Sequence, residues 1–435
     1  MEYISTRGKT KPIGFKESVL MGLATDGGLL LPQEFPNVKN YLNEWKNLSF
    51  QQLAFEIISL FADDIPKSDL RKIIQDSYSN FSHEEITPTV KIGNLYILEL
   101  FHGPTLAFKD VALQFLGNMF SYILEKQGGC LNILGATSGD TGSAAIAGVR
   151  GKSNINIFIM HPTGRISPIQ EKQMTSVLDN NVFNLGIEGT FDDCQSIMKN
   201  TFADLDFKNK YSLGAINSVN WSRVLAQVVY YFYSAFSVMK STNSDQVRFS
   251  VPTGNFGNIF AGKIAMMMGL PIEKLLLATN ENDILYRYFE YGDYSSQKVV
   301  STISPSMDIQ VASNFERYKY LNKISPNNFK KDKFIANRGT TNETLQTVRS
   351  YSENYNYLLD PHTALGVLAA KKNFSDIPTV CLATAHPAKF TDTMRQAIGK
   401  DVNHPILDKI KNAPTRFDKV PNEIKSVQNY LRDRL

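Results

Sequence analysis

Lys109 is the residue of this 435-residue chain whose surroundings most favour chemistry. It follows three apolar residues, 106–108, and opens a segment, 109–124, in which apolar residues recur at helical spacing. A helix dipole disfavours a cation at a helix start by ~0.3–1 kcal/mol, and partial burial lowers the pKa of a lysine further. Such a lysine is nucleophilic as the free amine, which predicts a Schiff-base lysine. The alternative is a lysine whose long side chain reaches back to water.

A glycine-rich turn that contains Gly254 and Gly257 is a second candidate site. It follows a strand-like run, 249–251, and precedes a helical segment, 258–268. The glycines let the backbone wrap closely, and the N–H groups of the first helical turn converge, which predicts a phosphate cradle. Neither a Walker lysine nor a GxGxxG pattern is present, so a nucleoside triphosphate is disfavoured. A turn that serves only tight packing is the alternative.

A third candidate lies at the strand-to-helix turn 135–144. Ser138 and Thr141 add hydroxyl groups to a helix start, and the small residues 142–145 allow close approach of a ligand. Donors that converge on a helix start suit a carboxylate. The alternative, that Asp140 or Thr141 is an ordinary N-cap, explains one residue but not the whole run.

Composition limits the classes of function. The chain is 43% hydrophobic and 20% charged, with a net charge of +4 and no long basic block, so nucleic-acid binding is not indicated. Three distant cysteines and six histidines without ligand spacing argue against a disulfide framework and a structural metal. No signal-peptide pattern opens the chain, and no run reaches the roughly 18–20 apolar residues of a membrane helix. We therefore expect a soluble, cytoplasmic enzyme or binding protein.

The order of the expected elements predicts an α/β protein. Residues 1–92 resemble a separate, mostly helical domain, and strands alternate with helices from residue 93 to 435. This second region is too long for one sheet, so we expect two parallel-sheet lobes with a cleft between them, residues 130–215 forming the smaller lobe. Residues 285–335 are rich in Tyr, Ser, Asn and Lys with weak periodicity, and suggest an insertion or mobile flap.

Taken together, these segments resemble the fold-type II (tryptophan synthase β-like) pyridoxal-phosphate enzymes, and the threonine synthase family in particular. The resemblance rests on motifs that occur in the family's order, at residues 6–7, 24–29, 98–110, 137–142, 162–167, 217–221, 252–258 and 383–387. Each motif is weak by itself, and the ordered set is specific. The length and the helical amino-terminal unit are similar to those of the longer bacterial and fungal members.

The resemblance implies a pyridoxal 5'-phosphate site. Lys109 would be the catalytic lysine that holds the cofactor, and Thr384 would place a hydroxyl at the pyridine nitrogen. Asp140 would face the cofactor or a donor, because a carboxylate beside the substrate's own carboxylate would repel it. The implied phosphate cradle consists of the backbone N–H groups of Gly254, Asn255, Phe256, Gly257 and Asn258.

The substrate that the resemblance implies is O-phospho-L-homoserine, which carries a second phosphate. Ser138, Gly139 and Thr141 would face its α-carboxylate or the cofactor's ring oxygen. The donors expected for its phosphate are Arg165, Ser218, Asn220 and Arg223. Arginine suits bidentate phosphate recognition, although Arg223 could instead form a surface ion pair. Lys389 is a weaker phosphate candidate, and His386 is expected to be a core histidine.

The implied activity is a carbon–oxygen lyase acting on phosphates, in the last step of threonine biosynthesis. It would convert O-phospho-L-homoserine and water to L-threonine and phosphate, by γ-elimination and β-addition of water. The alternatives are a phospho-lyase that stops at 2-oxobutyrate, a serine/threonine dehydratase, and a non-catalytic binding protein on the same fold. We expect a small-molecule partner, no nucleic acid or membrane, and a monomer or homodimer.

Overall fold

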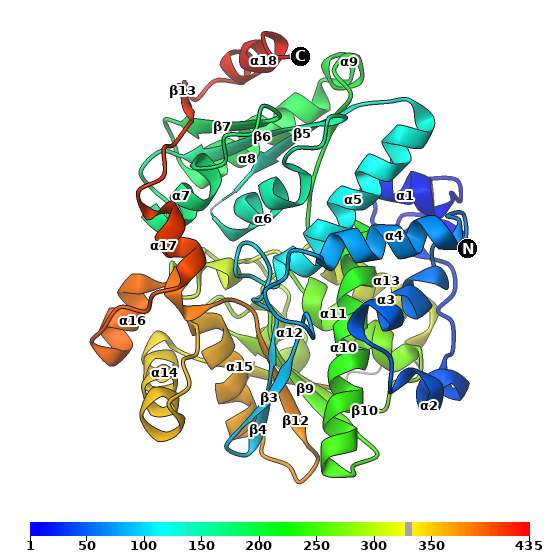
Figure 1. Cartoon of the computed structure of the whole chain (residues 1–435), viewed down its shortest axis with the longest axis vertical. Coiled ribbons are helices and arrows are strands. Elements are labelled where there is room, and N and C mark those ends of the chain that lie inside the picture. The colour runs from blue at the N-terminus through cyan, green and yellow to red at the C-terminus, as the bar shows by residue number, and fades with distance from the viewer. Residues whose placement is uncertain (138, 327–332) are drawn as a thin grey trace.

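Two β-sheets with helices around them form the body of the protein, in a computed structural model that describes residues 1–137, 139–326 and 333–435. The larger sheet lies in the lower half of Figure 1 and the smaller sheet in the upper half. Helices from the amino-terminal part of the chain pack beside the larger sheet's helices (Figure 1). This arrangement confirms the predicted α/β fold with two lobes built on parallel sheets.

The larger sheet has the strand order β11-β10-β9-β12-β4-β3. Its strands are β3 (Thr89–Ile92), β4 (Leu95–Glu99), β9 (Val247–Pro252), β10 (Ile272–Thr279), β11 (Phe334–Arg338) and β12 (Thr379–Ala383). All neighbours are parallel except β3 and β4, which pair antiparallel. The antiparallel hairpin strand β3 therefore closes one edge of an otherwise parallel sheet.

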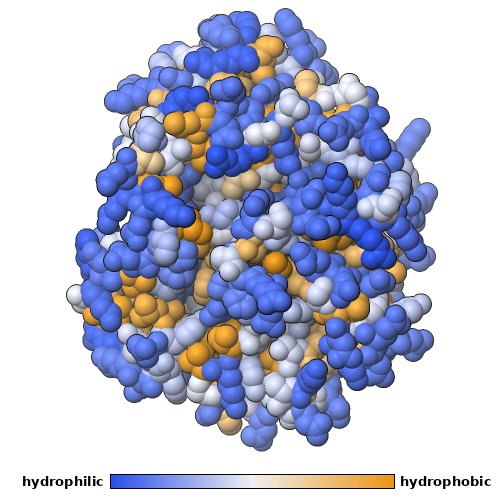
Figure 2. All heavy atoms as spheres, viewed as in Figure 1, coloured by the Kyte–Doolittle hydropathy of each residue, from blue (hydrophilic) through white to orange (hydrophobic). Residues whose placement is uncertain are grey.

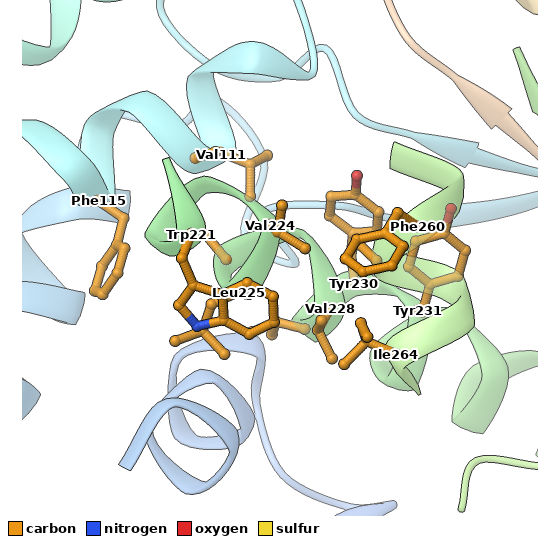
Figure 3. Packing of buried hydrophobic residues seen from close by; sticks show 14 of the residues in the cluster. Val111, Phe115, Trp221, Val224, Leu225, Val228, Tyr230, Tyr231, Phe260 and Ile264 are labelled. Carbon is orange, nitrogen blue, oxygen red and sulfur yellow. The ribbon is translucent and has the colours of Figure 1, made fainter. Parts of the chain in front are cut away.

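Helices cover the larger sheet and supply most of its core. They are α5 (Lys109–Gln127), α10 (Trp221–Thr242), α11 (Gly257–Met267), α12 (Ile284–Tyr291), α13 (Phe315–Ile324), α14 (Thr341–Tyr355), α15 (Pro361–Lys372) and α16 (Thr391–Ile398). Helix α10 is buried along most of its length, as its apolar sequence predicts. Figure 3 shows Val224, Leu225 and Val228 of α10 packed between Val111 of α5 and Ile264 of α11.

The smaller sheet has the order β13-β7-β6-β5-β8, with every neighbouring pair parallel. Its strands are β5 (Leu131–Ala136), β6 (Ile155–Pro162), β7 (Val182–Ile187), β8 (Leu213–Gly214) and β13 (Asp418–Val420). The helices of this lobe are α6 (Asp140–Val149), α7 (Pro168–Thr175), α8 (Phe191–Ala203), α9 (Leu205–Lys210) and α18 (Ile424–Arg432). The end of the chain thus returns through α17 (Pro405–Lys411) to complete the sheet formed by 131–214 (Figure 1).

The amino-terminal segment is mostly helical, with a short antiparallel ribbon. It contains β1 (Tyr3–Ser5), α1 (Phe15–Met21), β2 (Leu30–Pro32), a 3-10 turn (Lys39–Tyr41), α2 (Leu42–Trp45), α3 (Phe50–Ser59) and α4 (Lys67–Tyr78). Tyr3, Phe35 and Phe61 pack around the buried Trp221 at the start of α10. Because these contacts bury large aromatic surface, the segment shares its core with the larger lobe.

The segment 285–335 is more regular than its sequence suggests. It carries α12, α13 and a 3-10 turn (Pro305–Met307), and residues 327–332 lie outside the described part. Phe289 stacks on Phe256, and Phe315 and Tyr318 meet the same ring edge-on, so this part of the chain belongs to the core of the larger lobe. These helices argue against the expected mobile flap, and the insertion stays a prediction. The sequence did not reveal the two helices because their aromatic residues recur at irregular spacing.

Polar side chains cover most of the face seen in Figure 2, with apolar residues in small separate groups. No helix within the described residues is long and apolar enough to cross a membrane. The described side chains also contain no group of His, Cys, Asp or Glu that could hold a metal ion.

Candidate active site

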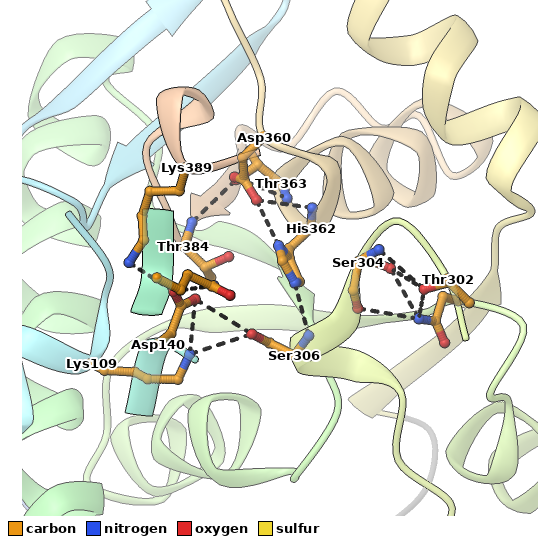
Figure 4. Close-up of polar contacts among 12 residues, drawn as sticks. Lys109, Asp140, Thr302, Ser304, Ser306, Asp360, His362, Thr363, Thr384 and Lys389 are labelled. Atoms are coloured by element: carbon orange, nitrogen blue, oxygen red, sulfur yellow. Dashed lines mark hydrogen bonds and ion pairs between the residues drawn. The ribbon is translucent and has the colours of Figure 1, made fainter. Parts of the chain in front are cut away.

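The carboxyl ends of several parallel strands carry the residues singled out from the sequence. The segments after β4, β5, β9 and β12 lead respectively to Lys109, Asp140, the glycine-rich turn and Thr384. In open parallel sheets this edge is where ligands bind. Figure 4 shows Lys109, Asp140, Thr384 and Lys389 close together, from segments far apart in the sequence.

Lys109 is the first residue of α5 and is 8% exposed. Burial lowers its pKa, the Asp140 carboxylate opposes that shift, and the cations of Lys389 and Arg223 lower the pKa further. Its Nζ lies 3.4 Å from Asp140 Oδ2 and 3.5 Å from Ser306 Oγ. The lysine is thus buried and held by polar partners, rather than reaching out to water as in the alternative interpretation.

Local hydrogen bonds fix the turn that precedes Lys109. The Asp110 carboxylate accepts from the backbone N–H of Thr105 at 2.8 Å and from its hydroxyl at 2.6 Å. A Cβ at Gly103 would lie 2.4 Å from Asp110 Cβ, so only glycine fits there. Phe108 N–H donates to the carbonyl of Thr384 at 2.8 Å, which ties the start of α5 to the end of β12.

Asp140 is the charge that balances the buried cations. Its Oδ1 lies 2.7 Å from Lys389 Nζ and accepts from Gln170 Nε2 at 2.8 Å. The carboxylate is buried, which raises its pKa, but Lys389 and Lys109 outweigh burial and hold the pKa well below its usual range. Asp140 is therefore ionised beside Lys109.

The glycine-rich turn before α11 has the geometry of an anion cradle. Among the described residues, none accepts a hydrogen bond from the backbone N–H groups of Asn255, Phe256, Gly257 and Asn258. Phe256 adopts a left-handed backbone (φ 63°), and its ring is buried in an aromatic cluster. The Asn258 side chain turns to α10, where its Oδ1 accepts from Tyr230 Oη at 2.5 Å. The backbone N–H groups of this turn are thus available to an anion, and the predicted phosphate cradle stays a prediction.

Arg223, one of the residues predicted to bind the substrate's phosphate, is a buried cation. It lies one turn into α10 and is 3% exposed, and burial lowers its pKa to about 10. Its Nε and Nη1 have no hydrogen-bond partner in the described part of the chain. A surface ion pair, the alternative interpretation, does not apply to it. A buried guanidinium with unpaired nitrogens is stabilised by a bound anion.

Ser218 and Asn220 have structural partners. Ser218 Oγ accepts from Asn255 Nδ2, which links the turn before α10 to the cradle. Asn220 caps α10 by accepting from Ser222 N–H at 3.0 Å, and its Nδ2 donates to the carbonyl of Val19 at 2.8 Å. The side chain of Asn220 is thus engaged away from Lys109.

The remaining predicted donors are spread over the smaller lobe. Gly139 precedes α6 with φ 150°, and a Cβ there would lie 2.4 Å from Gln170 Oε1. Thr141 is half-buried in the first turn of α6. Arg165 is exposed after β6, and its charge acts on Asp193. The predicted role of Ser138 falls outside the described residues.

Several polar residues beside Lys109 were not predicted from the sequence. Figure 4 shows Ser306, Asp360, His362 and Thr363 joined by hydrogen bonds that lead to Thr384, whose N–H donates to Thr363 Oγ1 at 3.1 Å. Lys389 also proves to be a partner of Asp140. No short motif marks these residues, and Asp360 before Pro361 was the one local signal, that of a helix N-cap.

The residues present fit pyridoxal phosphate. The free backbone N–H groups of the cradle suit its phosphate, and the buried lysine of lowered pKa suits its aldehyde. At Gly254 a Cβ would lie 2.9 Å from the carbonyl oxygen of Ser306, so the loop has room only for glycine. Thr384 is buried directly after β12, and its predicted contact with a ring nitrogen stays a prediction.

Comparisons with known proteins agree with this site. Residues 2–78 match the family model "Threonine synthase N terminus", residues 81–384 match "Pyridoxal-phosphate dependent enzyme", and residues 363–431 match "Threonine synthase, C-terminal". The threonine synthase of Saccharomyces cerevisiae is 45% identical over 98% of this chain and 93% of its own length. That of Pseudomonas aeruginosa is 42% identical over 99% and 98%.

Solved structures extend the likeness to the fold. The pyridoxal-phosphate-bound threonine synthase of Brucella melitensis superposes with a TM-score of 0.95 at 44% identity, covering 100% of this chain and 99% of its own. The yeast threonine synthase gives a TM-score of 0.93 at 43% identity, covering 100% and 98%. The predicted resemblance, fold type and cofactor are confirmed. The chain belongs to the threonine synthase family of pyridoxal-phosphate-dependent enzymes.

Proposed function

We propose that this enzyme is a threonine synthase that converts O-phospho-L-homoserine and water to L-threonine and phosphate. Relatives of this name match over 98–99% of this chain and 93–98% of their own lengths. We also propose that it acts in the cytoplasm as a monomer or homodimer. A single chain brings together Lys109, Asp140 and the cradle, so the site does not require a second copy.

The observation that carries the proposal is the buried Arg223. Its cation acts on Lys109, and two of its nitrogens are buried without a partner among the described residues. A phosphate on the substrate would satisfy these donors, whereas serine or threonine carries no such group. This favours a phosphorylated substrate over a dehydratase reaction.

Lys109 is placed to move protons. When bound, pyridoxal phosphate supplies an electron-withdrawing ring that stabilises negative charge at the substrate's α-carbon. Burial and the nearby cations favour the neutral amine of Lys109, which can accept a proton at Nζ and return it. Asp140, kept ionised by Lys389, holds the protonated Nζ in place. Backbone N–H groups of residues 255–258 fix the phosphate, and Arg223 binds the leaving phosphate.

Product analysis tests the proposal directly. We expect purified enzyme with O-phospho-L-homoserine to release threonine and phosphate in equal amounts, with little 2-oxobutyrate. Oxo-acid in place of threonine would identify a phospho-lyase, and turnover of unphosphorylated serine or threonine would identify a dehydratase. Lys109→Ala should remove both the absorbance band of the lysine-bound cofactor and the activity. Covalent cofactor retained in that variant would refute the role of Lys109.

Arg223→Met tests the role assigned to the guanidinium. We expect kcat/KM for the phosphorylated substrate to fall at least about 100-fold, because a charged, desolvated hydrogen-bond partner is lost. The ligand-free variant should be at least as stable as the wild type, since a buried unpaired cation has been removed. Arg150→Met, at an exposed arginine paired with Asp179, is the matched control and should leave both quantities unchanged.

A further inference from the structure

Ser306 lies beside the two central charges of the site. Its Oγ is 3.5 Å from Lys109 Nζ and 3.5 Å from Asp140 Oδ2. A serine hydroxyl both accepts and donates, so it can bridge an ammonium and a carboxylate. Both contacts are at the long end of the hydrogen-bond range, as is common at active sites before a ligand closes them. Ser306 is the middle residue of the 3-10 turn Pro305–Met307.

A buried histidine–aspartate pair holds this turn. Ser306 N–H donates to His362 Nε2 at 3.2 Å, and His362 Nδ1 lies 2.8 Å from Asp360 Oδ1. Because Nε2 accepts, the ring proton sits on Nδ1 and is donated to Asp360. His362 and Asp360 are 3% and 1% exposed, and the His362 ring packs edge-on against Phe390 at 5.1 Å.

The pair is itself fixed at the start of α15. Asp360 is the N-cap, and its carboxylate accepts from the backbone N–H groups of His362 at 2.9 Å and Thr363 at 3.3 Å. Thr363 Oγ1 also donates to Asp360 and accepts from Thr384 N–H. The chain of hydrogen bonds in Figure 4 therefore runs from the end of β12 to the turn beside Lys109. Every member except Ser306 is buried.

The same turn touches the anion cradle. At Gly254 a Cβ would lie 2.9 Å from the Ser306 carbonyl oxygen and 3.0 Å from Met307 Cα. A turn held at His362 thus sets the position of a hydroxyl at Lys109 and of the backbone against Gly254. The contact with His362 therefore positions both the Ser306 hydroxyl and the backbone next to Gly254.

We propose that Ser306 is a positioning residue for the Lys109 amine, and that His362 and Asp360 position Ser306. The hydroxyl orients Nζ beside Asp140, so that the lysine would attach pyridoxal phosphate and move protons efficiently. This inference rests on the part of the proposed function that makes Lys109 the cofactor-bearing residue. It does not depend on the identity of the substrate.

The test follows the attachment of the cofactor to Lys109. Cofactor-free protein is mixed with pyridoxal phosphate, and the absorbance band of the lysine-bound form gives a first-order rate. We expect Ser306→Ala to slow attachment about tenfold, the effect of losing one hydrogen bond to a charged group. Ser306→Thr keeps the hydroxyl and should restore at least half of the rate. With substrate, kcat should fall in Ser306→Ala while KM stays within about threefold.

Ser304→Ala is the matched control. Ser304 is buried in the same segment, but its Oγ accepts from Asn280 Nδ2 at 2.9 Å and does not contact Lys109. This variant should attach the cofactor at the wild-type rate. Equal rates for Ser306→Ala and Ser304→Ala would overturn the proposal.

Variants of His362 test the anchor. His362→Ala should slow attachment as much as Ser306→Ala, because the N–H of Ser306 loses its acceptor. His362→Gln offers an amide oxygen to that N–H and should recover most of the rate. Circular dichroism and the thermal midpoint establish that each variant is folded. Equal attachment rates for His362→Ala and the wild type would overturn the positioning role of His362 and Asp360. Normal attachment in a wild type that does not turn over O-phospho-L-homoserine would refute the substrate assignment alone.

Discussion

Asp140 carries the electrostatic balance of the site, because it is the carboxylate that both Lys109 and Lys389 contact. Lys389 is completely buried at its side chain and also donates to the carbonyl of Thr105 at 2.8 Å. When both amines are protonated, two buried lysines next to one carboxylate leave net positive charge. That excess suits a site that binds anions, and it costs stability when no anion is bound.

Asp140→Asn should therefore be strongly destabilising. It leaves two lysines in a buried site without a counter-charge, and breaking a buried ion pair costs about 3–5 kcal/mol. The free energy of unfolding of the cofactor-free protein, from urea denaturation, measures the loss. The double variant Asp140→Asn with Lys389→Met removes one cation as well and should recover at least half of the stability, without activity. A single variant as stable as the wild type would contradict the assigned charge balance.

Individual site residues could be predicted from the sequence where a short motif of neighbouring residues marks them. Lys109, Gly254 and Gly257 stand in motifs of a few residues, so type and spacing are sufficient. Ser306 and His362 are different, because their role arises from contacts with Lys109, 197 residues away, and with each other, 56 residues apart. Lys389 was predicted only as a weaker phosphate ligand, and no sequence pattern shows that it contacts Asp140.

At the scale of elements, the cradle before α11 depends on the absence of a side chain at Gly254. We expect Gly254→Ala to weaken pyridoxal-phosphate affinity at least about tenfold, because the added Cβ meets backbone atoms of Ser306 and Met307 that have to shift. Gly129→Ala is the control, since its Cβ would make only an ordinary contact with Leu124 Cδ2 at 3.6 Å. Spectroscopic titration of the cofactor-free proteins gives both affinities. Equal affinity in Gly254→Ala would show that the turn at Ser306 does not confine the cradle.

Strand β6 contains a buried histidine that makes stability depend on pH. Burial lowers the pKa of His161 to about 4, against an ordinary value of 6.5, so the unfolded chain binds more protons between these values. The free energy of unfolding should consequently rise from pH 4 to pH 6.5 and be lost as the pH falls. His161→Leu should reduce that change by on the order of 2 kcal/mol. Equal pH dependence of the two proteins in urea denaturation would contradict the assignment. His386, whose pKa burial also lowers to about 4, should leave a residual dependence.

Elements with strong periodicity could be predicted, and those that rely on distant partners could not. Segments 111–124 and 221–239 lie in helices α5 and α10 because apolar residues recur along them. Strand β13 is too short for a recognisable pattern and exists because β7 offers it an edge. The helices of 285–335 likewise depend on an aromatic cluster that includes Phe256 and Phe334.

At the scale of the whole molecule, the smaller lobe is built from two distant parts of the chain. Val420, Val427 and Leu431 are buried with Ile187 and Cys194 in one apolar cluster. We expect deletion of 415–435 to expose this cluster at a cost on the order of 5 kcal/mol. Limited proteolysis should then cut within 131–214, while the rest of the chain stays protected. Deletion of 433–435 alone is the control and should leave the wild-type cleavage pattern. Unchanged protection of 131–214 in the longer deletion would contradict the stabilising role of β13 and α18.

The burial of Trp221 gives the molecule an optical property. The chain has two tryptophans, Trp45 and Trp221, and neither lies in the smaller lobe. Trp221 is fully buried among Tyr3, Phe35 and Phe61, with the guanidinium of Arg317 5.8 Å from its ring. In a Trp45→Phe background, the emission wavelength of the remaining indole would report when the amino-terminal segment leaves the larger lobe. Unfolding confined to the smaller lobe would leave this emission unchanged, so the fluorescence follows the release of the amino-terminal segment alone, without an added label.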